Sequence, residues 1–158
     1  MSRVAYTIFC RIAIIAILGL TLSGCTVWGN NRTNLLDTTK IDVTIGDKDY
    51  VLTVASSVDS RQRGLSNITN LPSNEGMLFV FDTIEKHTFW MKDTQIPLDI
   101  IWLDKAWKVV AFQQMIVEPD PSDPQWTYEP DKEAKYAIEL NLNTLDNSII
   151  GTTVIIKP

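Results

Sequence analysis

The chain has 158 residues, with 14 basic and 19 acidic side chains and a formal net charge of −5. This acidic balance argues against nucleic acid as a partner, because phosphate backbones are bound by clustered basic side chains. One histidine, His87, and two cysteines, Cys10 and Cys25, are too few for a zinc site with several His or Cys ligands. No glycine-rich phosphate loop occurs either, so we expect neither a metal nor a cofactor.

The N-terminus has the three parts of an export signal. Arg3 and Arg11 supply positive charge, residues 12–22 form an apolar run, and Leu-Ser-Gly precedes Cys25. This ending resembles the lipobox of bacterial lipoproteins, in which the cysteine thiol receives a diacylglyceryl group and becomes the new N-terminus. We therefore predict a signal peptide over residues 1–24 and lipidation of Cys25.

An uncleaved membrane anchor is the alternative, but eleven apolar residues are short beside the roughly 20 that a spanning helix needs. Cleavage leaves 134 residues with 12 basic and 19 acidic side chains, a net charge of −7, and no disulfide. The predicted partner is the membrane, through lipid on Cys25. By resemblance to lipoprotein sorting in Gram-negative cells, Thr26 after the cysteine favours the periplasmic face of the outer membrane.

Residues 25–40 are polar and predict a tether between the lipid and a single domain over residues 41–158. Apolar and polar side chains alternate over residues 41–45, and an apolar run returns after a glycine turn, which predicts a β-hairpin. Residues 57–65 predict a helix, with Ser57 as its N-cap and Gly64 at its C-terminal end.

Further strands are predicted at residues 77–81, 88–91, 98–103, 107–113, 135–142 and 153–156. Many short strands with one short helix predict a mainly β fold, a single antiparallel β-sandwich or barrel of jelly-roll type. We expect His87 to be an exposed residue at the start of its strand.

Residues 118–131 differ from their surroundings because they hold four prolines and five acidic side chains. Proline lacks a backbone donor, so this segment cannot be an interior strand. Long loops in compact domains are usually functional or disordered, and Trp126 and Tyr128 favour docking on a surface. Two interpretations of this segment remain open, a lid over a site and a plain surface loop.

Four motifs occur in order along the domain: Arg61-x-x-Gly64-Leu65, Gly76-Met77-Leu78-Phe79-x-Phe81, Phe89-Trp90-Met91-Lys92-x-Thr94-x-Ile96-Pro97-Leu98-Asp99 and Tyr136-x-x-Glu139-Leu140. Together they resemble the family called domain of unknown function 192, over about residues 41–157. The resemblance implies a compact β-sandwich of jelly-roll type, often exported or lipid-anchored, and brings no established activity. Members commonly have Asn where Asp93 stands, and cysteine in the region of the Pro-rich loop, where this chain has none.

Strand alternation over residues 88–91 puts Phe89 and Met91 on one face and Trp90 and Lys92 on the other. The restricted turn before Pro97 follows at once. Polar side chains of the motifs can therefore converge on one site beside an aromatic wall, as in a small-molecule pocket. The predicted ligand-binding residues are Arg61, Trp90, Lys92, Thr94, Asp99 and Glu139. The same residues also fit a purely structural network, since buried polar groups must be satisfied whatever the function.

Two functional hypotheses follow. In the first, the protein is a membrane-anchored accessory module that binds a small polar ligand or an envelope protein. In the second, it is a hydrolase in which Asp93 and Asp99 form a carboxylate pair. A serine triad is disfavoured, because no Gly-x-Ser-x-Gly elbow is present to accompany His87.

Overall fold

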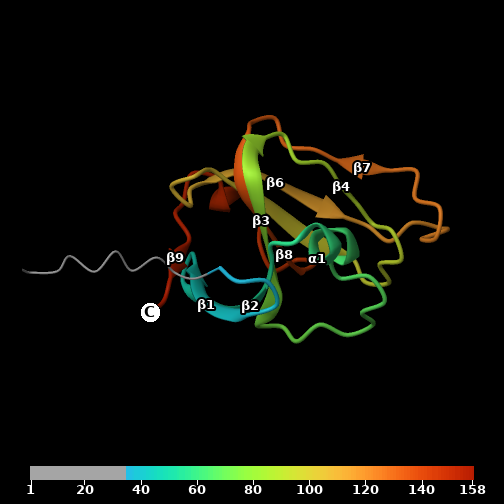
Figure 1. Ribbon diagram of the computed structural model, residues 1–158, viewed down its shortest axis with the longest axis horizontal. Helices are drawn as coiled ribbons and strands as arrows, with labels where there is room; N and C mark the ends of the chain where they lie inside the picture. The colour runs from blue at the N-terminus through green and yellow to red at the C-terminus, as the bar shows by residue number, and fades with distance from the viewer. Residues whose placement is uncertain (1–34) are drawn as a thin grey trace, which may run out of the picture. The chain divides into compact units, whose positions relative to one another are not determined.

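The computed structural model describes residues 35–158, so the predicted signal peptide, Cys25 and most of the tether lie outside the described residues. Its strands are β1 (Lys40–Ile45), β2 (Lys48–Ala55), β3 (Glu75–Glu85), β4 (Phe89–Trp90), β5 (Leu98–Leu103), β6 (Val109–Met115), β7 (Thr127–Tyr128), β8 (Ala134–Asn141) and β9 (Ile155–Ile156) (Figure 1). The helices are α1 (Val58–Arg63) and the short 3-10 helix η1 (Asn147–Ile149). Within residues 35–158, no helix has the length and apolar character needed to cross a membrane.

Seven strands form one curled sheet in the order β6-β5-β8-β3-β2-β1-β9, and β4 and β7 form a separate two-stranded sheet. The predicted mainly β fold with one short α-helix is thus confirmed. Within it, β2 and β3 run parallel, whereas we expected antiparallel pairing. The reason is the connection: parallel neighbours need a crossover of a dozen or more residues, and residues 56–74 with α1 supply it.

The two elements with the clearest sequence signals form as predicted. The β1–β2 hairpin closes with Ile45 opposite Lys48, and Gly46 adopts a positive φ of 63° in its turn. At the start of α1, Ser57 accepts a hydrogen bond from the Ser60 amide and the Ser60 hydroxyl accepts one from the Ser57 amide. This reciprocal arrangement is a capping box, which satisfies amide groups that a helix start leaves free.

The end of the predicted tether is part of the domain. The Asp37 carboxylate accepts hydrogen bonds from the amides of Ser56 and Ser57 and from the Ser60 hydroxyl. These bonds, led by the one from Ser60, hold the pKa of Asp37 well below its usual range. Residues 25–40 are therefore not tether throughout, because from Leu35 onward the chain contacts the domain and fixes the start of α1.

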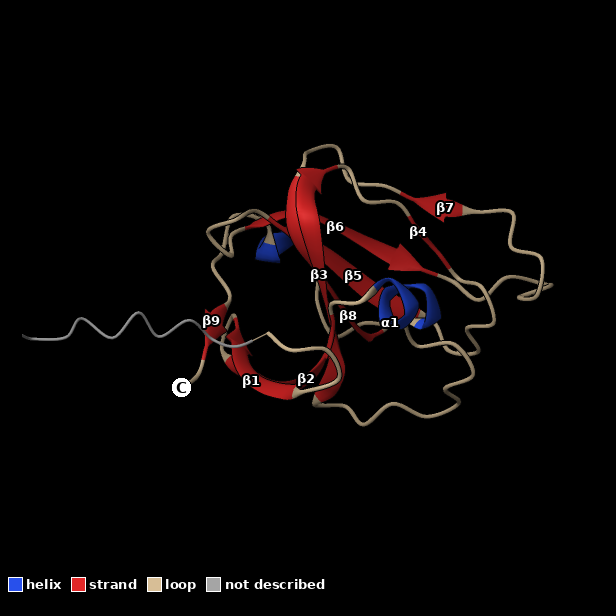
Figure 2. Cartoon of the chain, in the orientation of Figure 1, coloured by secondary structure: helices blue, strands red, loops and turns tan. Residues whose placement is uncertain are grey.

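Both faces of the large sheet are buried, and strand alternation divides their side chains. One face carries the first core cluster, which includes Leu52, Leu78, Ile101, Leu103, Ile138 and Leu140. The other carries a second cluster, which includes Leu65, Phe79, Phe89, Met91, Ile100, Trp102 and Ala137. We call this second face the helix face of the sheet, because Leu65 after α1 and Phe89 of β4 pack on it. Most of the remaining chain is loop, chiefly residues 64–74 and 116–126 (Figure 2).

The expectation of an exposed His87 is wrong. Only 8% of it is exposed, and its ring stacks on Phe81 with centroids 3.5 Å apart. Its carbonyl also accepts a hydrogen bond of 3.0 Å from Trp102 Nε1. Burial lowers the pKa of His87. Its neighbours Lys86 and Thr88 are both exposed, so the local sequence gives no sign of this packing.

Candidate functional site

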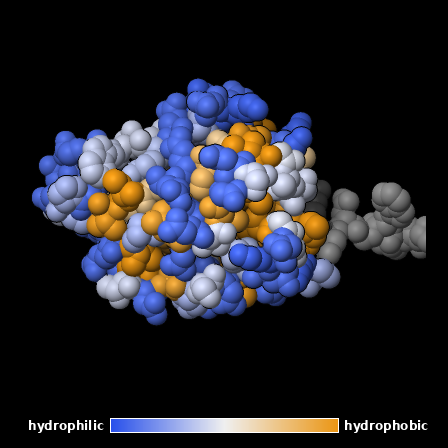
Figure 3. Space-filling view, turned by 180° about the vertical axis from the view of Figure 1, so that it is seen from behind, coloured by the Kyte–Doolittle hydropathy of each residue, from blue (hydrophilic) through white to orange (hydrophobic). Residues whose placement is uncertain are grey.

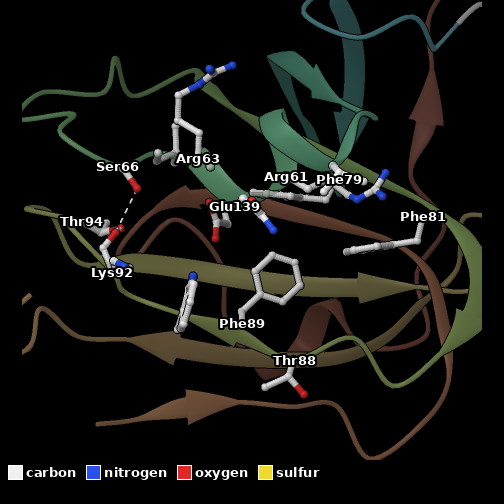
Figure 4. A pocket seen from close by; sticks show the side chains of 15 residues that line it. Arg61, Arg63, Ser66, Phe79, Phe81, Thr88, Phe89, Lys92, Thr94 and Glu139 are labelled. Carbon is white, nitrogen blue, oxygen red and sulfur yellow. Dashed lines mark hydrogen bonds between the residues drawn. The ribbon is translucent and has the colours of Figure 1, made fainter. Parts of the chain in front are cut away.

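A pocket of about 260 Å³ lies against the helix face of the sheet, lined by residues of α1, β3, β4 and β8 (Figure 4). Five of the six predicted ligand-binding residues line it: Arg61, Trp90, Lys92, Thr94 and Glu139. They come from three separate stretches of sequence, which the fold brings together. Residues that sequence reasoning did not assign to the site also contribute, among them Arg63, Ser66 and Phe79.

Aromatic rings form one side of the pocket. As predicted, Phe89 and Met91 are buried, while Trp90 is 51% exposed and Lys92 is also exposed. Phe89 meets Phe79 edge to face, with centroids 4.9 Å apart and planes at 89°. Edge-to-face contact is a favoured geometry for aromatic pairs, so Phe89 is held firmly by the core. Trp90, on the opposite side of the strand, remains open to a ligand.

Glu139 lies among the pocket side chains, with Thr94 and Lys92 on one side and Phe89 on the other (Figure 4). It occupies the middle of the sheet, opposite Met77 of β3 and Ile100 of β5. Only 5% of the residue is exposed, and no described residue gives its carboxyl a hydrogen bond or an ion pair. Burial raises the pKa of this carboxyl from 4.5 to about 8.

Close packing of the backbone sets the position of Glu139. A Cβ atom on Gly76 would lie 2.4 Å from the Glu139 carbonyl oxygen, so only glycine lets β3 approach β8 this closely. With its pKa near 8, the carboxyl is mainly protonated at neutral pH. In that state it can donate a hydrogen bond to a ligand and carries no charge.

Three cationic side chains line the same pocket, and they differ in what they contact. Arg61 donates hydrogen bonds to the carbonyls of Ser56 and Val80 and lies 5.6 Å from the Phe81 ring centroid, so it mainly holds α1 to β3. Arg63 and Lys92 are exposed and make no ion pair with any residue from 35 to 158. The Lys92 ammonium lies 5.6 Å from the Trp90 ring centroid. These two cations are therefore available to a ligand.

Asp99, which we predicted in the same site, lies elsewhere. The register pairs Ile100 with Glu139, so Asp99 faces the opposite side of the sheet. It is fully buried, and its Oδ2 accepts hydrogen bonds from the amides of Thr144 and Leu145 at 2.7 and 2.8 Å. Asp99 thus anchors the loop after β8, which is a structural role.

Asp93 joins two loops through its backbone. Its amide donates to the Pro121 carbonyl at 2.7 Å, and its carbonyl accepts from the Asn67 amide at 2.8 Å. Its φ is 53°, in the left-handed region that Asn and Asp enter more readily than most residues. Asp93 lines a neighbouring hollow, and Asp99 does not.

The Pro-rich loop is closed at its base by a buried acid. Glu118, 4% exposed, accepts hydrogen bonds from the amides of Gln125 and Trp126 at 2.5 and 2.9 Å. The loop then forms β7, which pairs with β4 and places Tyr128 opposite Phe89. It supports the aromatic side of the pocket from outside, and none of residues 118–131 lines the pocket itself. Within the described residues, no three His, Cys, Asp or Glu side chains are grouped as metal ligands.

Comparison with known proteins gives a family and a fold. The family model DUF192, described as "Uncharacterized ACR", matches residues 41–156. One similar crystal structure is that of a Sinorhizobium meliloti protein described as a candidate transcription regulator. It is 20% identical to this chain, with a TM-score of 0.65, and the match covers 77% of this chain and 95% of that one. A Novosphingobium aromaticivorans protein of unknown function is 24% identical with a TM-score of 0.61, covering 76% and 84%. No curated protein matches the chain.

Replacing Asp99 tests its anchoring role. Asp99→Ala should lower the free energy of unfolding by about 2–3 kcal/mol, because two partly buried amides lose their fully buried acceptor. Asp99→Asn keeps an acceptor oxygen and should cost less. Denaturant unfolding monitored by tryptophan fluorescence measures both variants. An Asp99→Ala protein as stable as the wild type would show that these hydrogen bonds contribute nothing.

Replacing Glu139 tests its burial as a neutral acid. A carboxyl whose pKa is raised on folding stabilises the protein fully below pH 4.5 and loses that contribution as the pH rises through 8. Glu139→Gln cannot ionise. The difference in free energy of unfolding, Glu139→Gln minus wild type, should therefore rise by up to about 5 kcal/mol between pH 4.5 and pH 8.5. His87 titrates in both proteins and cancels in the difference. A pH-independent difference would contradict the assignment.

Proposed function

The chain belongs to the domain of unknown function 192 family, and we propose that it is a lipid-anchored protein of the cell envelope that binds a small ligand in the pocket beside α1. The observation that carries the proposal is the buried Glu139 carboxyl, which lines this pocket without a protein partner. A carboxyl that opens only onto a pocket takes its hydrogen bonds from water or from a ligand in that pocket. A ligand that takes the place of water beside this carboxyl is the interpretation that we favour.

The surroundings of Glu139 support a ligand site over a purely structural network. In a structural network the cations that line the pocket would all be paired with acids. Arg61 lies 3.8 Å from the Asp82 carboxylate, whereas Arg63 and Lys92 make no ion pair with any described residue. Trp90 is half exposed beside them, although a large aromatic ring is costly to leave in water. Pockets with an apolar wall and a few convergent polar groups are typical small-molecule sites.

A small ligand is favoured over a docked envelope protein. On the face opposite to the view of Figure 1, hydrophobic side chains form separate groups divided by hydrophilic ones (Figure 3). Protein interfaces are usually marked by larger continuous apolar patches. A concave site with an unpartnered acid is a more specific feature than this divided surface.

The hydrolase alternative has less support from the geometry. A glycosidase-type mechanism needs two carboxyl groups that face each other across one cleft. Asp99 is buried on the opposite face of the sheet, and Asp93 lines a different hollow. Glu139 is the one carboxyl that lines the pocket, so the described residues offer no second acid there. We therefore propose binding and not hydrolysis.

The proposed location rests on the N-terminal sequence. An export signal that ends in Leu-Ser-Gly before Cys25 supports lipidation, and Thr26 supports sorting to the outer membrane in a Gram-negative cell. A domain attached by such a tether is confined to the membrane surface, which suits an accessory role in the envelope.

Mass spectrometry of protein purified from bacterial membranes tests the anchor. We expect the mature N-terminus at Cys25 with a diacylglyceryl modification, and we expect Cys25→Ser to leave the membrane fraction because no thiol remains to be modified. Cys10→Ser, within the predicted signal, is the matched control and should be processed normally. Recovery of chains with an intact Met1 would contradict the proposal.

Ligand screening tests the pocket. We expect at least one compound, from a library of bacterial metabolites and cell-wall fragments, to raise the melting temperature and to bind at least tenfold more weakly to Trp90→Ala. Trp126→Ala is the matched control, because Trp126 is similarly exposed and does not line the pocket. If no compound binds, or if every compound that binds has the same affinity for Trp90→Ala as for the wild type, the pocket is not the functional site.

A further inference from the structure

The pocket concentrates positive charge in an acidic protein. Residues 35–158 contain only two arginines, Arg61 and Arg63, and both line it together with Lys92. Arg61 is held by backbone carbonyls, whereas Arg63 and Lys92 are exposed, and the Arg63 guanidinium points away from Glu139 (Figure 4). Unpaired cations around a concave site attract anions more strongly than isolated surface cations do. The open side of the pocket therefore suits an anionic group.

The buried side of the pocket, at Glu139, suits an uncharged group of the ligand. Glu139 as a neutral acid donates one hydrogen bond, and an ionised Glu139 would repel an anion held a few ångströms away. A ligand oxygen that accepts this hydrogen bond satisfies the buried acid without adding a charge to the apolar floor. The ligand should therefore be charged at one end only.

The walls and the size limit the rest of the ligand. Phe79, Phe89 and Trp90 present rings, and Leu65 adds an aliphatic surface. Flat rings pack well against aromatic walls of this kind. At about 260 Å³, the pocket is smaller than the range typical of drug-sized ligands, so it suits a monomeric metabolite better than a nucleotide or an oligosaccharide.

Resting on the proposed function, we infer that the ligand is a small aromatic carboxylate. Its carboxylate lies at Lys92, and Arg63 reaches it by rotation of its exposed side chain. The ring of the ligand lies along Trp90 and Phe89, and an oxygen at its far end accepts a hydrogen bond from Glu139. The structure thus assigns the two free cations to charge recognition and Glu139 to the recognition of the uncharged end.

The ionisation of Glu139 makes this binding depend on pH. The charged groups near Glu139 come from α1, with Arg61 and Arg63, and from the segment after β4, with Lys92. The flanking strands place uncharged Met77 and Ile100 beside it. Asp93 lies in the adjoining hollow, and His87 stacks behind Phe81.

Four matched probes test separately whether binding needs the negative charge and the far oxygen of the ligand. Each probe is titrated into the lipid-free domain, residues 26–158, by isothermal calorimetry at pH 7. We expect 4-hydroxyphenylacetate to bind at least tenfold more tightly than its neutral amide, than the cation tyramine, and than phenylacetate, which lacks the far oxygen. Arg63→Met and Lys92→Met should each weaken its binding by about tenfold. Lys105→Met, an equal charge change outside the pocket, should leave it unchanged.

The second arm varies pH. With a pKa of about 8 for Glu139, the protonated fraction falls about tenfold between pH 7 and pH 9, and the affinity for 4-hydroxyphenylacetate should fall in proportion. Glu139→Gln should bind it with a pH-independent affinity over this range, because its amide still donates. Asp93→Asn, which removes an acid from the adjoining hollow, should bind it at least as tightly as the wild type.

Two results would overturn the inference: tighter binding of the amide or of tyramine, or no binding of 4-hydroxyphenylacetate at millimolar concentration. The proposed function fails separately. If the metabolite screen finds Trp90-dependent ligands that are neutral or cationic, the pocket function stands and only the carboxylate assignment falls. If neither the screen nor the probes give a Trp90-dependent ligand, both fail.

Discussion

A carboxyl group buried in the middle of a sheet, with no partner from residues 35–158, is the constraint on which the rest of the site depends. Glu139 lies between Met77 and Ile100 on a face that otherwise carries apolar side chains. Such a group is tolerated when it is neutral or when something else satisfies it. Burial alone raises its pKa to about 8, so the protein keeps an uncharged hydrogen-bond donor at the floor of a pocket.

The walls of the pocket are positioned by contacts outside it. Asp37 accepts hydrogen bonds from the start of α1, and Arg61 in the last turn of this helix donates to the Val80 carbonyl. The helix in the crossover between the parallel strands β2 and β3 is therefore held at both of its ends. Glu118 closes the Pro-rich loop, whose β7 strand pairs with β4. Trp90 therefore extends from a braced strand, and Lys92 lies in the turn directly after it, where its carbonyl accepts a hydrogen bond from the Ser66 hydroxyl.

Local signals predicted much of the fold and of the site. The capping of α1 by Ser57 and the turn at Gly46 involve neighbouring residues, so they could be identified from sequence. The failures concern long-range placement. We predicted Asp99 in the same site because it closely follows Lys92 and Thr94, but Ile100 and not Asp99 is opposite Glu139, so the two acids face opposite sides of the sheet. The burial of His87 and the parallel β2–β3 pair likewise depend on segments distant in sequence, which no local pattern encodes.

The ionisation of Glu139 in the unliganded protein is the most direct test of this account. Carbon-detected NMR of the glutamate side-chain carboxyls, titrated from pH 3 to pH 10 and assigned by comparison with Glu139→Gln, gives its pKa without any assumption about the ligand. We predict a midpoint near 8 for Glu139. A Glu139 midpoint near 4.5 would show that its carboxyl is solvated or paired, and would contradict the account of the pocket.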